Sequence, residues 1–116
     1  MKTIIAGGRD FNDYNYLEDV MNMCSFEVTE IVCGKARGAD TLGEKWGKSK
    51  GIPVKYFIPD WNGLGKKAGH VRNRDMGDYA DALVAFWDKK SKGTKGMIDY
   101  ATKKGLRVTV FEYGDE

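Results

Sequence analysis

The chain has 116 residues, of which 41% are hydrophobic and 12% aromatic, and its formal net charge is +2. This length suits one domain with a substantial core, and the composition excludes a disordered chain. A net charge so close to zero argues against a protein that mainly coats nucleic acid or a membrane surface.

The sequence carries no sign of export or of a metal centre. Its first residues do not form a charged segment followed by an apolar one, and no stretch approaches the ~18 apolar residues of a membrane span. Cys24 and Cys33 do not have the spacing of a redox or zinc pair, and His70 is the only histidine. We therefore expect a cytoplasmic protein with no membrane partner, no bound metal and no cofactor.

The first half of the chain predicts three strands and two helices. Residues 3–6 and 30–33 are short apolar runs that stop at glycine, as is typical of strands covered on both faces. Asp13 is a candidate N-cap for a helix after the first run, and Asp40 is a candidate N-cap for a helix after the second. Residues 54–58 form the third predicted strand.

The second half of the chain predicts two more helices and two more strands. After a loop over residues 60–67, the spacing of apolar residues across 71–80 indicates a helix. Residues 82–87 form the most apolar of the predicted strands. A helix over 94–101 and a strand over 107–111 complete the pattern.

These elements place the protein in the α/β class. Strands that alternate with helices are not joined as hairpins, so we expect a five-stranded parallel sheet with helices on both faces. The simplest strand order is 3-2-1-4-5, within a single domain over residues 1–116.

The sheet topology predicts where a ligand binds. In an open parallel sheet, ligands lie beyond the carboxyl ends of the strands, near the point where the strand order reverses. This rule selects the loops at residues 7–10, 34–40, 60–74 and 88–95, where glycines let backbone N–H groups approach an anion closely. With Asp75, these loops hold eleven Lys and Arg against five Asp, a charge of +6 that leaves −4 for the rest. We therefore expect a polarised protein whose positive end receives a phosphate.

The last of these loops is the best candidate for the phosphate site. Ser91, Gly93 and Thr94 precede a predicted helix, whose first N–H groups and dipole favour an anion. The alternative is that Ser91 or Thr94 only caps the helix and that Gly93 only forms a turn. The fingerprints of dinucleotide-binding and P-loop enzymes, GxGxxG and GxxxxGK[ST], are absent.

Other loop residues allow two interpretations each. Arg72 has the planar fork that suits a phosphate, but it is equally compatible with a solvent-exposed side chain. Arg9 and Asp10 either contact the ligand or form a local ion pair that shapes the loop. Trp61 and Trp87 either stack on a base or pack against the protein.

Short motifs in these loops follow one another in a fixed order. They are GGRDF at 7–11, GxAxGAD at 34–40, DW at 60–61, GKxAG at 65–69, RNxxM at 72–76, AFWD at 85–88 and SxGT at 91–94. Together they resemble the YspA-like (YAcAr) branch of the SLOG superfamily. The resemblance implies a Rossmann-like fold that binds nucleotides or nucleotide-derived molecules. The candidate ligand-binding residues are Gly7, Gly8, Arg9, Asp10, Gly34, Gly38, Ala39, Asp40, Trp61, Arg72, Asn73, Trp87, Asp88, Ser91, Gly93 and Thr94.

The superfamily includes the LOG phosphoribohydrolases, and the sequence departs from them at one position. In LOG enzymes, a glutamate three residues after the threonine of a glycine-rich loop helps to cleave an N-glycosidic bond. Carried over by position, the threonine is Thr94 and the glutamate position is Met97. A thioether neither acts as a base nor stabilises an oxocarbenium-like centre. The remaining catalytic candidates are Asp10, Asp40 and Asp88, with Arg72 to stabilise developing charge.

The leading hypothesis is a protein that binds a small nucleotide-derived ligand: a nucleotide, an NAD-derived molecule or a cyclic signal nucleotide. It would act as a sensor or a sequestering protein, a task that suits a compact phage-encoded chain. The alternative is a hydrolase that cleaves the N-glycosidic or a phosphate bond of a nucleotide. Single-strand DNA binding of the DprA/Smf kind is a third, weaker hypothesis, because the charge disfavours nucleic acid as a partner. The resemblance also implies that a homo-oligomer can form.

Overall fold

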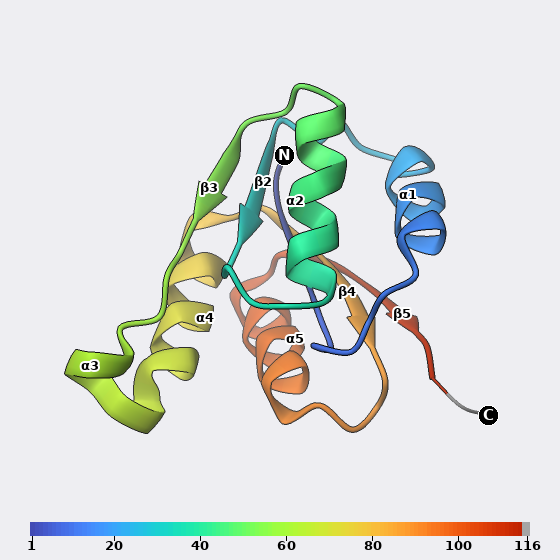
Figure 1. Ribbon diagram of the computed structural model, residues 1–116. Coiled ribbons are helices and arrows are strands. Elements are labelled where there is room, and N and C mark those ends of the chain that lie inside the picture. Colours follow the sequence, from blue (N-terminus) through green and yellow to red (C-terminus); the bar gives the residue numbers. More distant parts are fainter. Residues whose placement is uncertain (115–116) are drawn as a thin grey trace.

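The short apolar runs of the sequence become the strands of one parallel sheet. In the computed structural model, which describes residues 1–114, the strand order is β3-β2-β1-β4-β5 (Figure 1). The predicted strand order and the predicted α/β class are therefore confirmed. The strands are β1 (Lys2–Gly7), β2 (Glu30–Cys33), β3 (Val54–Tyr56), β4 (Ala82–Trp87) and β5 (Arg107–Glu112).

Strand β1 lies at the centre of the sheet, between β2 and β4. Thr3 pairs with Ile31 of β2 on one side and with Ala82 of β4 on the other, and both pairings are parallel. Ile4 and Ile5 are fully buried in the cores on opposite faces of the sheet. Burial on both faces explains why this strand is a continuous apolar run and not an alternating one.

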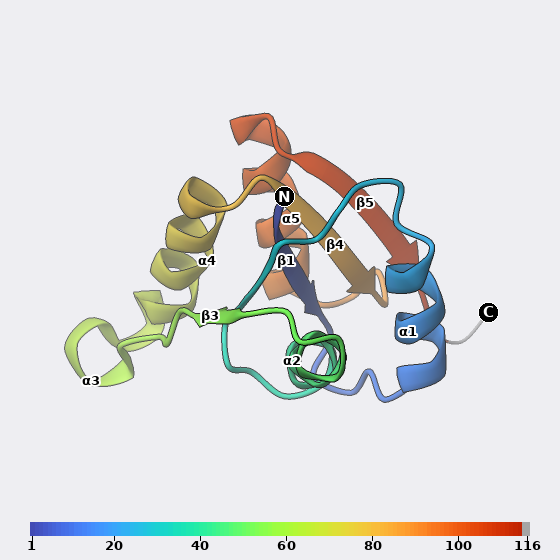
Figure 2. The ribbon, with the colours of Figure 1, turned by 90° about the horizontal axis from the view of Figure 1, so that it is seen from above.

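Helices cover both faces of the sheet, as predicted (Figure 2). The four main helices are α1 (Tyr14–Asn22), α2 (Ala39–Ser49), α4 (Ala68–Tyr79) and α5 (Lys92–Lys104). Met76 and Met97 pack with Ile4 under α4 and α5, whereas Leu17 packs with Ile5 under α1 and α2. Within residues 1–114, no helix combines the length and the apolar character needed to span a bilayer.

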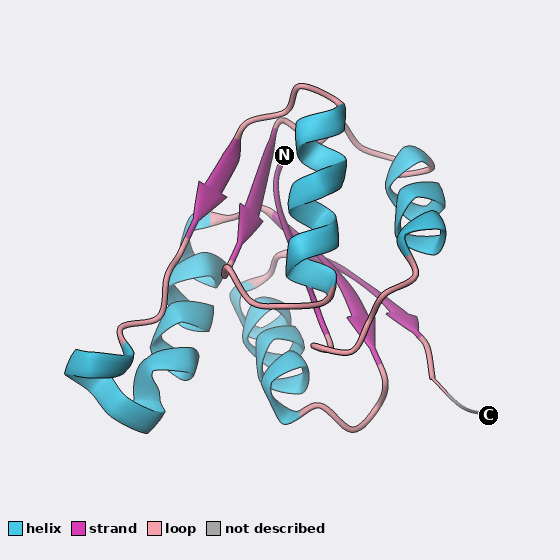
Figure 3. Cartoon of the chain, viewed as in Figure 1, coloured by secondary structure: helices cyan, strands magenta, loops and turns pink. Residues whose placement is uncertain are grey.

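The segment predicted as a loop over residues 60–67 contains two short helical turns (Figure 3). They are α3 (Trp61–Leu64) and the 3₁₀ turn η1 (Gly65–Lys67). Asp60 stabilises the first turn, because its Oδ1 accepts a 2.9 Å hydrogen bond from the N–H of Gly63. The structure therefore adds these two turns to the four predicted helices.

The third strand ends earlier than predicted, at Tyr56 instead of residue 58. β3 lies at the edge of the sheet and pairs with β2, whose last residue, Cys33, is the partner of Tyr56. The N–H of Phe57 still donates a 2.9 Å hydrogen bond to the carbonyl oxygen of Cys33, but after Cys33 the chain turns into the loop before α2 and the ladder ends.

Of the two predicted N-caps, one is confirmed and one is wrong. Asp13 caps α1, because its Oδ1 accepts a 3.1 Å hydrogen bond from an N–H of the first turn. Asp40 does not cap α2: the N-cap is Gly38, and Asp40 lies within the first turn with its carboxylate turned back to the preceding loop. Gly38 has a φ of +78°, and a Cβ there would lie 2.1 Å from the carbonyl oxygen of Gly8. The helix therefore begins at a position that only glycine fits.

Candidate functional site

The loops after β1, β2 and β4 meet at the carboxyl edge of the sheet, where the strand order reverses (Figure 1). Between them lies a cavity of about 100 Å³, here called the inner cavity, lined by Arg9, Asp40, Arg72, Asn73 and the first residues of α5. Pockets that hold whole small molecules measure about 300–1,000 Å³. The inner cavity therefore suits one small group, such as a phosphate.

The N-terminus of α5 forms one wall of the inner cavity through Ser91, Gly93 and Thr94. Ser91 is the N-cap, because its Oγ accepts a 3.3 Å hydrogen bond from the N–H of Thr94. A Cβ at Gly93 would meet no other heavy atom within 4 Å, so the chain at this position borders open space. A helix N-terminus presents backbone N–H donors and the positive end of the helix dipole, so this wall favours an anion.

Arg72, in α4, connects the loops that follow β2 and β4. Its Nη1 donates a 2.6 Å hydrogen bond to the carbonyl oxygen of Gly34, and its Nε donates a 3.0 Å bond to Oδ1 of Asn73. The amide of Asn73 donates in turn to the carbonyl oxygen of Gly93, at 3.3 Å. These contacts fix the guanidinium at the inner cavity, so Arg72 is not a freely solvated side chain.

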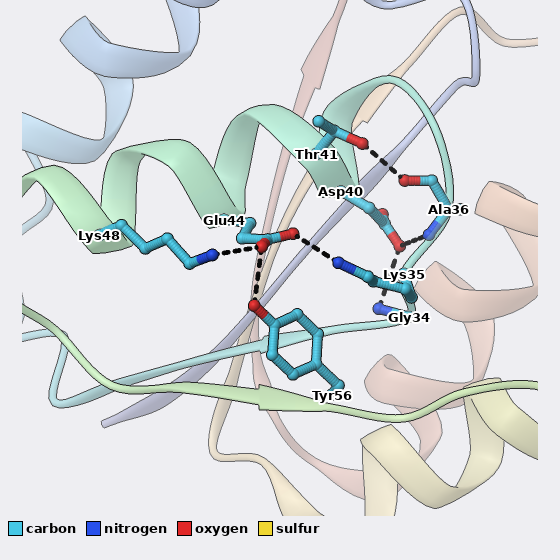
Figure 4. Close-up of polar contacts among 8 residues, drawn as sticks. All are labelled: Gly34, Lys35, Ala36, Asp40, Thr41, Glu44, Lys48 and Tyr56. Carbon is cyan, nitrogen blue, oxygen red and sulfur yellow. Dashed lines mark hydrogen bonds and ion pairs between the residues drawn. The ribbon is translucent and has the colours of Figure 1, made fainter.

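Asp40 is buried between α2 and the loop that follows β2 (Figure 4). Its Oδ2 accepts hydrogen bonds from the N–H groups of Gly34 and Ala36, at 3.0 and 3.4 Å. Burial raises the pKa of Asp40 to about 6, although the charge of Arg72 and the two N–H donors act in the opposite direction. Burial also lowers the pKa of Arg72 from its ordinary value, and the charge of Asp40 counteracts this. The inner cavity therefore contains a carboxyl group that changes its ionisation near neutral pH.

Glu44, in α2, contacts the loop between β2 and α2 through Lys35 (Figure 4). It accepts hydrogen bonds from Nζ of Lys48 at 2.8 Å and from the hydroxyl of Tyr56 at 2.7 Å, and these contacts lower its pKa to about 2. Its other carboxylate oxygen lies 3.5 Å from Nζ of Lys35. Lys35 has a φ of +61°, a left-handed conformation that is unfavourable for a residue with a side chain.

A second cavity of about 200 Å³, here called the outer cavity, adjoins the inner one. Arg9, Ala36 and Arg72 line both cavities. The outer cavity is also lined by Gly34, Lys35, Arg37, Pro59 and Trp61. Trp61 is 53% exposed, so its ring offers a flat surface on which a planar group can stack.

The structure brings most of the residues selected from the sequence together. Those that line the inner cavity are Gly7, Arg9, Asp40, Arg72, Asn73, Ser91, Gly93 and Thr94. Gly34 and Trp61 line the outer cavity. The candidates that line neither cavity are Gly8, Asp10, Gly38, Ala39, Trp87 and Asp88.

Several of these last residues shape the loops around the site. Asp10 accepts a 2.6 Å hydrogen bond from the hydroxyl of Tyr113, on the far side of its loop. Asp88 accepts two 2.8 Å bonds from backbone N–H groups of its own loop, which lower its pKa. The indole N–H of Trp87 donates a 3.1 Å bond to the carbonyl oxygen of Ser91. Of the two candidate tryptophans, Trp61 lines the outer cavity, whereas the indole of Trp87 is engaged by the loop before α5.

Sequence reasoning missed some lining residues as members of the site. Lys35 and Arg37 line the outer cavity, and both lie in the loop over residues 34–40, which had been selected because it follows the carboxyl end of a strand. Their charge was counted in the +6 of the selected loops, but neither residue was named as a ligand contact. Ala6, at the end of a buried strand, carries no functional group that could have revealed its place in the inner cavity.

Met97 lines the inner cavity and is 1% exposed. At the position where LOG enzymes carry their glutamate, this chain therefore has a buried methionine, which packs in the core with Ile4 and Met76. Of the three carboxylates that could replace the glutamate, Asp40 lines the inner cavity, whereas Asp10 and Asp88 do not.

A larger cavity of about 520 Å³, here called the α1 groove, lies between α1 and the strands β4 and β5. It is lined by Tyr16, Asp19, Val20, Met23, Cys24, Ser25, Phe26, Val84, Thr109 and Phe111. No Lys or Arg is among these residues, but Arg107 lies beside the groove, where it donates a 2.8 Å hydrogen bond to Oγ of Ser25 and lies 5.1 Å from the ring centroid of Phe26.

Comparison with known proteins identifies the family. The model of the YspA, cpYpsA-related SLOG family matches residues 1–63, which include the loops after β1 and β2. The chain belongs to this family. The gene 61 protein of Mycobacterium phage D29 is 31% identical to this SLOG-family chain over 125 residues, which cover 99% of the chain and 98% of the phage protein. The resemblance inferred from the loop motifs is therefore confirmed.

A solved structure supports the Rossmann-like architecture of this SLOG-family chain. DNA processing protein A (DprA) from Streptococcus pneumoniae matches it with a TM-score of 0.76 at 19% sequence identity. The match covers 99% of this chain and 50% of the DprA chain, so the SLOG-family chain spans about half the length of DprA. At this level of identity, the similarity shows the fold alone.

Proposed function

We propose that this protein binds a small nucleotide or nucleotide-derived molecule at the carboxyl ends of β1, β2 and β4. The observation that carries the proposal is that Arg9, Arg72 and the N-terminus of α5 line one cavity. Two guanidinium groups and a helix N-terminus are the groups that proteins use to bind phosphate. The inner cavity would hold the phosphate of the ligand.

The outer cavity supports a ligand larger than phosphate alone. It adjoins the inner cavity, and its lining combines the exposed Trp61 with three cationic residues, Arg9, Lys35 and Arg37. A base or a second phosphate would lie there. A nucleotide, an NAD-derived molecule and a cyclic signal nucleotide all fit this description.

We propose sensing or sequestering as the role, because Met97 replaces the carboxylate on which LOG chemistry depends. A protein that binds without turnover would remove a nucleotide signal from solution. The similarity to a phage protein is in keeping with such a role for a phage-encoded chain.

The binding proposal is tested by thermal shift and isothermal titration with inorganic phosphate, AMP, NAD and a cyclic dinucleotide. We expect at least one nucleotide to raise the melting temperature and to compete with phosphate. Arg9→Ala should weaken that binding at least about tenfold, because it removes a charge-assisted contact. Arg9 is exposed, so the melting temperature of the free variant should not change.

Arg74→Ala is the matched control, since Arg74 lies in α4 two residues from Arg72 but lines neither cavity. It removes the same charge and should leave the affinity unchanged. If both variants lose the same nucleotide affinity, the effect of Arg9→Ala comes from net charge and not from a contact in the cavity. If none of the four compounds binds to the wild type, the proposal is contradicted.

A nucleotide hydrolase is the second candidate function, because Asp40 brings a carboxyl with a pKa of about 6 into the inner cavity. A group with such a pKa is suited to proton transfer near neutral pH. Chromatography of the bound nucleotide before and after incubation separates the two candidates. Binding alone predicts complete recovery of the nucleotide, whereas the hydrolase predicts cleavage that Asp40→Asn abolishes.

A further inference from the structure

Asp40 has one oxygen that the protein leaves free. The residue is only 6% exposed, and Oδ2 accepts both of the hydrogen bonds that the loop donates, from Gly34 and Ala36 (Figure 4). Oδ1 has no hydrogen-bond partner within residues 1–114. Among those residues, however, no buried side-chain oxygen lacks a partner. Oδ1 therefore retains access to open space, and Asp40 lines the inner cavity, so we infer that Oδ1 faces that cavity.

The inner cavity thus has two chemically different sides. On the α5 side, Ser91, Gly93 and Thr94 form the wall that favours an anion, and Arg9 adds positive charge. On the α2 side, Asp40 presents an acceptor that repels a phosphate when it is ionised and attracts a hydrogen-bond donor. A ligand that satisfies both sides carries a phosphate and, close to it, a neutral donor.

On the basis of the proposed function, we propose that Asp40 is a specificity-determining residue that accepts a hydrogen bond from a ribose hydroxyl of the ligand. The site then selects ribonucleotides over analogues that lack the sugar hydroxyls. In a nucleoside 5′-phosphate, the ring hydroxyls are the donors nearest to the phosphate, whereas the amino groups of the base lie beyond the glycosidic bond. The inner cavity is too small for a base. The phosphate and the ring hydroxyl next to it would therefore lie in the inner cavity, and the base would lie in the outer cavity.

The hydroxyl contact is tested by isothermal titration at about pH 7.5 with AMP, 2′,3′-dideoxy-AMP and IMP. A hydrogen bond to an ionised acceptor in a buried site discriminates strongly, so AMP should bind at least about tenfold more tightly than the dideoxy analogue. IMP lacks the amino group of the base but keeps the ribose, and it should bind like AMP.

Asp40→Asn keeps the shape of the side chain and an oxygen for the N–H groups of Gly34 and Ala36, but it removes the anionic acceptor. The preference for AMP over the dideoxy analogue should fall to within about threefold. Inorganic phosphate should bind more tightly to this variant than to the wild type, because a negative charge has left the cavity. A merely structural role for Asp40 predicts weaker binding of both compounds.

The pH dependence of the unmodified protein provides a test that needs no variant. The charged and titratable groups around Asp40 are Arg72 of α4, Cys33 of β2 and Arg9 of the loop after β1. Burial raises the pKa of Cys33 to about 11, and arginine keeps its charge, so Asp40 is the group among these that titrates near pH 6. The second ionisation of a phosphate ester, also near pH 6, affects AMP and dideoxy-AMP alike and cancels in their affinity ratio.

We expect the affinity ratio of AMP to dideoxy-AMP to fall as the pH is lowered from about 7.5 to about 5, because Asp40 becomes protonated. A ratio that stays constant, or equal affinities at every pH, overturns the role of Asp40 while the proposed function stands. A loss of affinity for IMP with retention of dideoxy-AMP also overturns it, in favour of a base contact. Failure of AMP and phosphate to bind at all would instead contradict the proposed function itself.

Discussion

Arg72 and Gly34 are far apart in the sequence, yet Nη1 of Arg72 donates a 2.6 Å hydrogen bond to the carbonyl oxygen of Gly34. The guanidinium fills the space that a side chain at position 34 would need, since a Cβ there would lie 2.2 Å from Nη1. The N–H of the same glycine is one of the two donors that hold Asp40. This contact between α4 and the loop after β2 therefore determines the shape of both cavities.

Gly34→Ala should displace the Arg72 side chain from the inner cavity. The loss of the hydrogen bond to the carbonyl oxygen should lower the free energy of unfolding by about 1–2 kcal/mol in urea denaturation. Nucleotide affinity should fall at the same time, because the guanidinium no longer faces the cavity. Gly96→Ala is the control: a Cβ there meets nothing within 4 Å, and this helical position should gain up to ~1 kcal/mol with unchanged affinity. Unchanged affinity in Gly34→Ala would contradict the role given to this contact.

Arg72→Lys keeps the charge but loses the planar fork. A lysine cannot donate to Gly34 and Asn73 while also facing a phosphate, so we expect weaker nucleotide binding and a stability loss of about 1–3 kcal/mol. Arg74→Lys makes the same chemical change on the exposed surface of α4 and should alter neither quantity. If Arg72→Lys behaves like Arg74→Lys, charge alone is sufficient and the geometry of the fork is irrelevant.

Ser91 combines a structural and a binding role that two substitutions can separate. Ser91→Ala removes the N-cap of α5 and should cost about 1 kcal/mol in the free energy of unfolding. Ser91→Asp keeps a capping side chain and should retain that stability, but its negative charge at the cavity should weaken phosphate binding. Unfolding and phosphate titrations on both variants check these outcomes. If Ser91→Asp binds phosphate as tightly as the wild type does, the phosphate does not bind beside Ser91.

Asp40 should make the stability of the folded protein depend on pH. Its pKa is about 6 in the folded state, above the ordinary value of 3.8, so the folded protein binds this proton more tightly than the unfolded chain. The contribution of this group to stability is therefore fully present below about pH 4 and is lost as the pH rises through about 6. The loss amounts to at most ~3 kcal/mol, since one pKa unit corresponds to about 1.4 kcal/mol.

Urea denaturation of the wild type and Asp40→Asn between about pH 4 and pH 7 isolates this effect. The stability of the wild type relative to the variant should decrease with rising pH. Glu44, whose pKa is lowered to about 2, has the opposite effect and is present in both proteins. A constant difference between the two proteins across this range would contradict the assignment.

The sequence was sufficient to predict the sheet, because burial on both faces leaves a continuous apolar run at each central strand, as in residues 82–87. The alternation of such runs with amphipathic segments then predicted the strand order and the edge at which the loops meet. Eight of the residues selected on that basis line the inner cavity, since topology alone brings those loops together.

The direction of individual side chains could not be predicted in the same way. Asp40 was predicted as an N-cap, but Gly38 is the N-cap, and the carboxyl of Asp40 turns into the preceding loop. Trp87 ends a central strand, yet its indole binds the carbonyl oxygen of Ser91. Such outcomes depend on contacts between loops, and the contact of Arg72 with Gly34 spans 38 residues.

The proposed function depends on the binding of a nucleotide phosphate in the inner cavity. The most direct test is a two-dimensional NMR titration of the ¹⁵N-labelled protein with AMP. We expect the amide signals of Gly93 and Thr94 at the start of α5, and of Gly34 and Ala36 in the loop after β2, to shift in a saturable way. Shifts confined to the α1 groove, or no saturable shift at any amide of the inner cavity, would contradict it.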